Sequence, residues 1–385
     1  MPLTRSQAAH HTRIPLAGGG QETLMSEVGA QYLLPLFSTR DACALRLVCR
    51  EFLAAVSEQP WEDRRTAIKG SIAAWRACFP RARCANVTAA KSMRGVFARP
   101  DVRATPVVDA DMVHFAGLRE LILAGAKGVT GRGLAHLRGI QVLNMSDCTG
   151  LSDAALVHLR GIQVLDISDC SGLTSAAFAH LEGIRKLRMD QCCQEELGDA
   201  AFAHLRGIQE LDMGSCWQES ITDAGLAHLK GIKVLNMNLC YQGGITDAAF
   251  LPLADSLREL NISMVDGGSQ FTDAAFAHLS GLRKLDMSYC SQDTISDAGF
   301  AHLGLCLESL HMRSCTQATL TDAALARLTG LKELEMPGCT QFTGSTIGAL
   351  QGLEFLDVSG CSHALICAAG RADLPMGEEE WEVYW

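Results

Sequence analysis

The sequence has few aromatic residues, few prolines and no long apolar run. Phe, Trp and Tyr make up 6% of the 385 residues, and there are 10 prolines. No stretch approaches the roughly 18 apolar residues that a membrane-spanning helix needs. Met1–Gly20 also lacks the apolar core that is typical of a secretion signal. We therefore expect neither membrane insertion nor export by such a signal.

Motifs of common catalytic and metal sites are missing as well. The chain has no P-loop, no G-x-S-x-G and no H-E-x-x-H. It has no C-x-x-C pair of the kind that RING-type zinc sites use. We expect no catalytic residues, no cofactor and no metal site, so the sequence does not predict an enzyme. The formal net charge of −10 argues against nucleic acid as a partner.

What the chain does contain is a repeat of 22 to 25 residues. Each unit begins at an apolar anchor, carries Leu three residues later and another apolar residue two further on. This alternation predicts a strand with one buried face. The period and the L-x-x-L-x-L spacing are typical of leucine-rich repeats. The anchors are Leu118, Ile140, Ile162, Ile184, Ile208, Ile232, Leu257, Leu282, Leu307, Leu331 and Leu353.

The second half of each unit predicts a short helix. In Ile221–Leu229, Leu226 and Leu229 share one helix face, Thr222 suits the N-cap, and Asp223 suits the first turn. A single unit cannot bury its own apolar face, so the units must stack. The predicted fold class is α/β: a leucine-rich-repeat solenoid shaped as a horseshoe, with parallel strands on the concave side and helices on the convex side.

Cysteine recurs eight residues after most anchors. Sixteen cysteines would suit a disulfide framework in an exported protein, but this spacing places nine of them in the interior, where free Cys behaves as a small hydrophobe. We expect a reduced protein located in the cytoplasm or nucleus. The pattern resembles the cysteine-containing class of leucine-rich repeats, common in eukaryotic F-box proteins. The nine are Cys148, Cys170, Cys192, Cys216, Cys240, Cys290, Cys315, Cys339 and Cys361.

A segment outside the repeat period, 21–61, predicts two amphipathic helices. The first carries Leu24 and Val28, and Pro35 would kink or end it. Ser38 to Asp41 make a polar break with capping residues. The second helix would place Leu45, Val48, Phe52 and Val56 on one face because their spacings are three, four and four.

This segment resembles an F-box, the helical module that docks onto the small adaptor of cullin-type ubiquitin ligases. The resemblance rests on Glu27-Val28, on Asp41, on the run ALRLVCREF from Ala44 to Phe52, and on Trp61. Leu24-Met25 stands where the family usually has Leu-Pro. The alternative is a helical cap that only covers the first repeat. The resemblance implies adaptor contacts by Leu24, Val28, Leu45, Val48, Phe52 and Trp61.

These observations predict five segments. They are a disordered tail (1–20), an F-box-like module (21–61), a basic connector with a degenerate capping repeat (62–105), the solenoid (106–366) and an acidic, aromatic tail (367–385). We expect the acidic, aromatic tail at residues 367–385 either to cover the last repeat or to hang free as a short binding motif.

The concave strand face is where a target would bind. Its three outward-facing rows carry ten acidic and four basic residues, which predicts a basic target because the charges lie within one Debye length of each other. The alternative is a merely solvated face. A row of histidines on the helices is expected to be structural and half-exposed. Predicted target contacts are Asn144, Asp166, Arg188, Asp212, Asn236, Asn261, Asp286, His311, Glu335 and Asp357.

Together these features predict a non-catalytic substrate-recognition subunit of an SCF-type E3 ubiquitin ligase. It would be a monomer within a larger complex, binding the adaptor and one protein substrate. The alternative is a leucine-rich-repeat interaction scaffold without a ligase role. The sequence names neither the target nor any modified residue in it.

Overall fold

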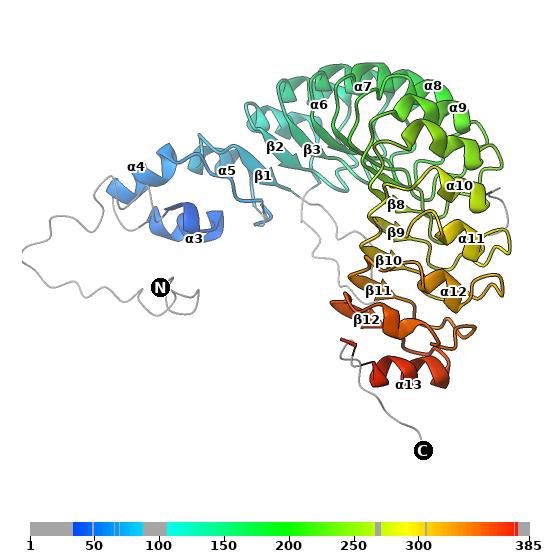
Figure 1. The fold of residues 1–385 in the computed structure, drawn as a ribbon. Coiled ribbons are helices and arrows are strands. Elements are labelled where there is room, and N and C mark those ends of the chain that lie inside the picture. Colours follow the sequence, from blue (N-terminus) through cyan, green and yellow to red (C-terminus); the bar gives the residue numbers. More distant parts are fainter. Residues whose placement is uncertain are drawn as a thin grey trace, which may run out of the picture.

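A computed structural model describes residues 34–47, 50–64, 66–68, 70–87, 106–265, 271–304, 306–372 and 374–375. Within these residues, twelve parallel strands form one sheet in chain order. Figure 1 shows the strands on the inner side of an arc and the short helices on its outer side. The predicted leucine-rich-repeat solenoid is confirmed.

The strands are short, and most repeats carry one helical turn or two. The strands are β1 (Cys84–Asn86), β2 (Glu120–Ile122), β3 (Val142–Asn144), β4 (Val164–Asp166), β5 (Lys186–Arg188), β6 (Glu210–Asp212), β7 (Val234–Asn236), β8 (Glu259–Asn261), β9 (Lys284–Asp286), β10 (Ser309–His311), β11 (Glu333–Glu335) and β12 (Phe355–Asp357). The α-helices between them are α6 (Gly131–Leu134), α7 (Asp153–Leu156), α8 (Asp199–Phe202), α9 (Asp223–Leu226), α10 (Asp273–Ala277), α11 (Asp297–Phe300) and α12 (Asp322–Leu325). The 3-10 turns are η2 (Asp109–Phe115), η3 (Ala135–Leu137), η4 (Val157–Leu159), η5 (Ser175–His180), η6 (Ala227–Leu229), η7 (Asp247–Leu253) and η8 (Ile347–Ala349).

The strands pair without a register shift, so equivalent residues of successive repeats lie side by side. Leu121 pairs with Leu143, which pairs with Leu165, and the same leucine row continues to Leu356. These leucines are buried. The core is therefore one continuous column that lengthens with each repeat, as expected of a solenoid.

The nine predicted cysteines do face the interior. Eight are buried and Cys361 is partly so. Each thiol lies 2.9–3.5 Å from a carbonyl oxygen of the preceding repeat, as Cys216 does from Met189. Burial raises the pKa of Cys148 to about 11 and that of Cys192 to about 12. These thiols are structural donors, not nucleophiles.

Aspartates at the start of the helices join each repeat to the next. The Thr222 hydroxyl caps α9 by accepting from the Ala224 N–H, as predicted. Asp223, however, reaches the following repeat: its carboxylate accepts from the Thr246 N–H at 2.7 Å and from the Thr246 hydroxyl at 2.7 Å. The aspartates that make such paired bonds to the next repeat are Asp109, Asp153, Asp199, Asp223, Asp247, Asp273, Asp297 and Asp322.

The N-terminal helices differ from their predicted bounds. After a 3-10 turn, η1 (Leu34–Leu36), the helix α3 (Thr39–Leu45) ends where the predicted second helix was to begin, and α4 (Arg50–Glu58) follows. The capping residues explain the difference. Ser38 and Asp41 form a capping box that starts a helix at once instead of only separating two.

The first repeat is covered by a third helix, α5 (Ile72–Cys78). Trp75 of α5 packs against Phe79 and Phe115, with ring centroids 6.0 and 6.4 Å apart. The following strand, β1, pairs with β2 and lies inside the predicted connector. α5 and β1 thus close the N-terminal end of the core.

The other end of the arc is closed by α13 (His363–Arg371), which runs across the boundary predicted at residue 366. Leu365 and Ala369 of this helix are buried. The acidic and aromatic residues 377–385 lie outside the described residues, as does the tail 1–20. In the parts of the chain that the structure describes, no helix is both long and apolar enough to cross a membrane.

Candidate functional site

Most side chains of the predicted target-binding row have a structural task. Their carboxylate or amide oxygen accepts the backbone N–H two residues later at 2.8–3.2 Å, which is an Asx turn at the strand exit. This turn explains why Asn and Asp dominate the row. The residues that make it are Asn144, Asp166, Asp212, Asn236, Asn261, Asp286 and Asp357.

Arg188 departs from this pattern. It stands between the acidic side chains of neighbouring strands, with its guanidinium 3.3 Å from Asp212, 3.7 Å from Asp190 and 4.0 Å from Asp166. Asp166 and Asp190 are themselves buried. Arg188 therefore offsets part of the acidic charge on β4–β6.

His311 and Glu335 are the other two predicted contacts that depart from the Asx pattern. They face each other across β10 and β11, and the coordinating atoms of His311, Glu335 and the neighbouring Glu333 all lie within 4.8 Å of one another. The sequence prediction missed Glu333 because it treated each outward-facing row separately, whereas this cluster combines two rows.

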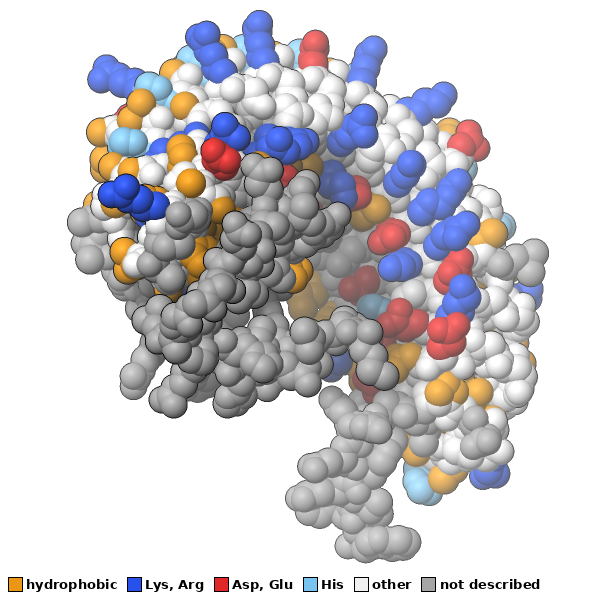
Figure 2. Space-filling view, turned by 90° about the vertical axis from the view of Figure 1, so that its left-hand side faces the viewer, with side chains coloured by type: hydrophobic (Ala, Val, Ile, Leu, Met, Phe, Trp, Pro, Cys, Tyr) orange, Lys and Arg blue, Asp and Glu red, His pale blue; other side chains and the backbone are white. Residues whose placement is uncertain are grey.

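The strands begin at a basic edge that the sequence reasoning did not recognise. In many repeats an exposed Lys or Arg lies two residues before the anchor or one residue after it, and Figure 2 shows Lys and Arg along the upper and right-hand edges of the molecule. We call this edge the entry rim. Its exposed basic residues are Arg119, Arg138, Arg160, Arg185, Arg206, Lys230, Lys233, Arg283 and Lys332.

The opposite edge, where the strands end, carries exposed apolar side chains in the middle repeats. Trp217 is 57% exposed, and Tyr241, Met264 and Tyr289 are each more than a third exposed. Met264 and Tyr289 also adopt positive φ of 56° and 60°. The same positive φ recurs at the equivalent position of other repeats, as at Asp147 and Ser215, so it belongs to the turn that follows each strand. We call Trp217, Tyr241, Met264 and Tyr289 the exit rim.

The histidine row on the helices is half-exposed to exposed, as predicted. Among its described members, His204 lies 4.0 Å from Glu182. The row members do not join any metal-ligand cluster found in the described residues. The row comprises His114, His136, His158, His180, His204, His228, His278 and His302.

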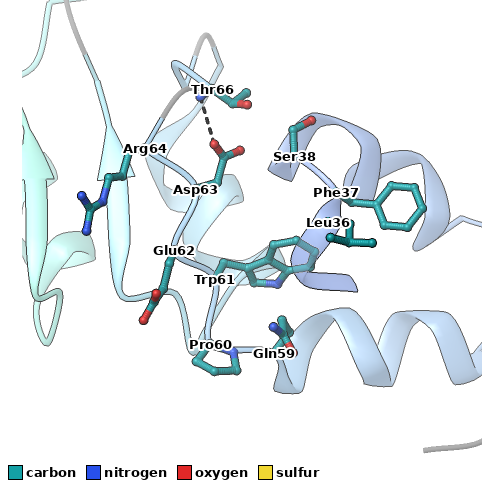
Figure 3. A pocket seen from close by; sticks show the side chains of 10 residues that line it. All are labelled: Leu36, Phe37, Ser38, Gln59, Pro60, Trp61, Glu62, Asp63, Arg64 and Thr66. Atoms are coloured by element: carbon teal, nitrogen blue, oxygen red, sulfur yellow. Dashed lines mark hydrogen bonds between the residues drawn. The ribbon is translucent and has the colours of Figure 1, made fainter. Parts of the chain in front are cut away.

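The N-terminal helices leave a second apolar surface open. Leu36 is 77% exposed and Leu47 is 89% exposed, while Phe37 and Leu53 are more than a third exposed. Beside them lies a cavity of about 770 Å³, whose wall runs from Leu36–Ser38 to Gln59–Arg64 and Thr66. Figure 3 shows Trp61 between Leu36 and Phe37 on one hand and Glu62 to Arg64 on the other.

The predicted adaptor contacts lie in three different environments. Leu24, Val28 and Val48 lie outside the described residues. Leu45 and Phe52 are partly buried. Trp61 is only 2% exposed: its indole N–H donates to the Val56 carbonyl oxygen at 2.8 Å, and its ring meets Phe79 edge-on.

The sequence analysis made no prediction for the exposed leucines, because it considered only the apolar face of each predicted helix. Leu47 lies at the break between α3 and α4. In this structure Trp61 joins the helices α3 and α4 to the capped solenoid.

No protein-family model and no curated protein matches the sequence. Solved structures do match it. The Toll–Spatzle complex of Drosophila is 15% identical with a TM-score of 0.53, over 80% of this chain and 43% of that one. The TLR13–ssRNA13 complex is 15% identical (TM-score 0.44, 73% and 58%), and internalin InlF of Listeria monocytogenes is 18% identical (0.48, 71% and 89%).

This chain spans less than two thirds of the TLR13 and Toll chains. At these identities the likeness to Toll shows the fold alone, and that fold agrees with the twelve stacked strands. The protein is a leucine-rich-repeat solenoid that carries an N-terminal helical extension.

Proposed function

We propose that this protein is the non-catalytic substrate-recognition subunit of an SCF-type E3 ubiquitin ligase. The N-terminal helices would bind the adaptor of a cullin-type ligase, and the concave side of the solenoid would bind a protein target. The protein would accelerate ubiquitin transfer only by raising the effective concentration of the target near the ubiquitin-loaded enzyme.

The observation that carries the proposal is the unused apolar surface of η1, α3 and α4. Leu36 and Leu47 are almost fully exposed, although α5 already closes the first repeat through Trp75. A helical segment that served only as a cap would turn its apolar residues toward the repeats. The exposed leucines instead favour a partner protein, as exposed apolar patches generally do. The F-box resemblance names the partner as the ligase adaptor.

The target-binding side of the proposal rests on the concave face and its exit rim. Aromatic and Met side chains are enriched at the centres of protein interfaces, and the exit rim places four of them in consecutive repeats. Among the described residues, no Lys or Arg forms an ion pair with Asp286, Glu335 or Asp357 on β9–β12, whereas Arg188 offsets part of the acidic charge on β4–β6. We expect a basic target that contacts the later repeats. That nucleic acid is not a partner stays a prediction.

Charge on the exposed leucines should abolish adaptor binding. We expect Leu36→Glu and Leu47→Glu together to weaken binding to the adaptor at least about 100-fold, because truncating or charging a central apolar anchor costs 2 kcal/mol or more. Titration of the purified full chain with the adaptor measures this. The matched control is Leu251→Glu, which charges a leucine that is 61% exposed on the convex side, and it should bind as the wild type does.

A deletion provides the second arm of this test. It should end at Glu58, because Trp61 packs on Phe79 and belongs to the capped solenoid. We expect loss of the preceding residues to remove adaptor binding and to leave the melting temperature of the solenoid nearly unchanged. Full adaptor binding by either altered protein would refute the proposal, and a large loss of thermal stability on deletion would favour the cap alternative.

A further inference from the structure

We propose that His311, Glu333 and Glu335 form a zinc site on the concave face. β10 and β11 pair in register, so His311 lies opposite Glu335, and Ser309 lies opposite Glu333. This pairing brings one imidazole and two carboxylates to within 4.8 Å of one another. All three side chains are half-exposed and accessible to an ion from the concave side.

The donor set suits zinc better than magnesium or calcium. Zinc accepts imidazole nitrogen and carboxylate oxygen at about 2.0–2.2 Å, whereas magnesium and calcium take almost only oxygen. Two ligand atoms in a tetrahedral zinc site lie about 3.4 Å apart. His311 Nε2 and Glu333 Oε1 are already 3.7 Å apart. Small rotations of the half-exposed Glu335 side chain would complete a three-ligand site.

Ser309 contacts two of the ligands, because its hydroxyl oxygen also lies 3.3 Å from His311 Nε2. Its hydroxyl donates to Glu333 Oε2 at 2.8 Å, which leaves Oε1 directed at the imidazole of His311. Hydrogen bonds that fix a ligating carboxylate in this way are common around metal sites and raise their affinity.

The fold itself does not require these residues. Seven other repeats place Asn or Asp at the position of His311 and Glu335, where the side chain accepts a backbone N–H. Two consecutive repeats give up this bond. For Glu335 the reason is visible, because Pro337 occupies the donor position and has no N–H to satisfy.

The local charge also favours a cation. Asp286 and Asp357 flank the cluster along the same row. Among the described residues, no Lys or Arg lies within ion-pair distance of Glu333 or Glu335. A divalent cation would relieve the repulsion between these carboxylates. Three protein ligands leave one coordination position open toward the concave side, where a side chain of a bound target would complete the site. This last step rests on the proposed function, whereas zinc binding itself does not.

Calorimetric titration of the reduced, metal-free full chain with zinc tests the proposal. We expect one zinc ion to bind per chain. His311→Ala should weaken zinc affinity at least about 10-fold, because even the loss of a group that only hydrogen-bonds a metal ligand costs that much. Glu335→Gln should do the same. The control is His278→Ala, a half-exposed histidine of the helical row, which should leave zinc affinity unchanged.

Cobalt(II) separates this site from adventitious thiol binding, since Cys306 is exposed and Cys367 partly so. We expect d–d bands of nitrogen and oxygen ligands without a thiolate-to-cobalt charge-transfer band. Absence of stoichiometric zinc binding, undiminished affinity in His311→Ala, or a strong thiolate band would each overturn the proposal. Adaptor binding is measured separately, so its failure would leave this result standing.

Discussion

Raising the pH from about 8 to about 9.5 is expected to destabilise the solenoid progressively. Eight of the nine interior repeat cysteines have raised pKa values, chiefly because they are buried. The pKa values of Cys148 and Cys361 rise to about 11, and those of Cys192, Cys240 and Cys339 rise to about 12. Burial raises the pKa of the remaining three as well. These are Cys170, Cys216 and Cys315.

The direction follows from proton binding. Above about pH 8.5 the unfolded chain loses its thiol protons while the folded chain keeps them. Below about pH 8.5 the protein has the full stability that comes from burying uncharged thiols. That stability is lost as the pH rises toward the pKa values of the thiols in the folded protein, about 11 for Cys148 and about 12 for Cys192. Above about pH 8.5 each buried thiol therefore lowers the free energy of unfolding, and all eight act in the same direction.

Urea unfolding followed by circular dichroism at a series of pH values measures this loss. Replacing one of these buried thiols, as in Cys216→Ala, should reduce the slope of stability against pH, whatever its effect at neutral pH. Cys306→Ala, at an exposed thiol, serves as the control and should leave the slope unchanged. A stability that stays flat up to about pH 10 would show that these thiols are not held neutral in the folded protein.

The second large effect is expected at the aspartates that join the repeats. Asp223→Ala removes an acceptor from both the Thr246 N–H and the Thr246 hydroxyl. Hydrogen bonds to a charged group contribute about 1.5–3 kcal/mol, and an unsatisfied backbone donor adds its own cost. We expect a loss of about 2–3 kcal/mol in the free energy of unfolding. Asp223→Asn should lose roughly half as much, because one oxygen remains to accept the N–H.

The control for this series is Asp293→Ala, which changes an exposed loop aspartate that does not join two repeats. It should change stability by less than about 0.5 kcal/mol, as most exposed substitutions do. Equal stability of Asp223→Ala and Asp293→Ala would mean that the inter-repeat bonds contribute nothing net.

Gly131 stands at the position that the bridging aspartate takes in other repeats, and it has no side chain to reach the next repeat. Hydrogen exchange should therefore show early opening of the backbone beside Gly131.

The sequence predicted the fold because the inward-facing residues alone carry the period. Leu, Cys and the anchors recur whatever lies between them, and the parallel register follows from stacking identical units. The aspartate ladder could not be read from one unit, since Asp223 has its partner in the next repeat. The boundary between the N-terminal helices was wrong because the capping box at Ser38 starts α3 earlier than helical periodicity suggests.

The candidate sites were harder to predict for a related reason. Asp166 and Asp212 have the composition of a binding face, yet each is used in an Asx turn. His311 and Glu335 are more informative, because they stand at the same position of their repeats and do not form an Asx turn. Reading the row as departures from a structural requirement, and combining neighbouring rows, would have found the cluster with Glu333 from the sequence.

The placement of charge on the arc has a kinetic consequence. Basic side chains line the entry rim, while the outward-facing strand positions are predominantly acidic. This separation gives the solenoid an electric dipole, with its positive end at the entry rim and its negative end on the concave strand face. An approaching partner with both acidic and basic segments would be rotated before it makes contact, because fields of this kind orient encounters over a Debye length or more. The arc would thus select the direction in which a polypeptide chain enters it, and this selection would fade as salt is added.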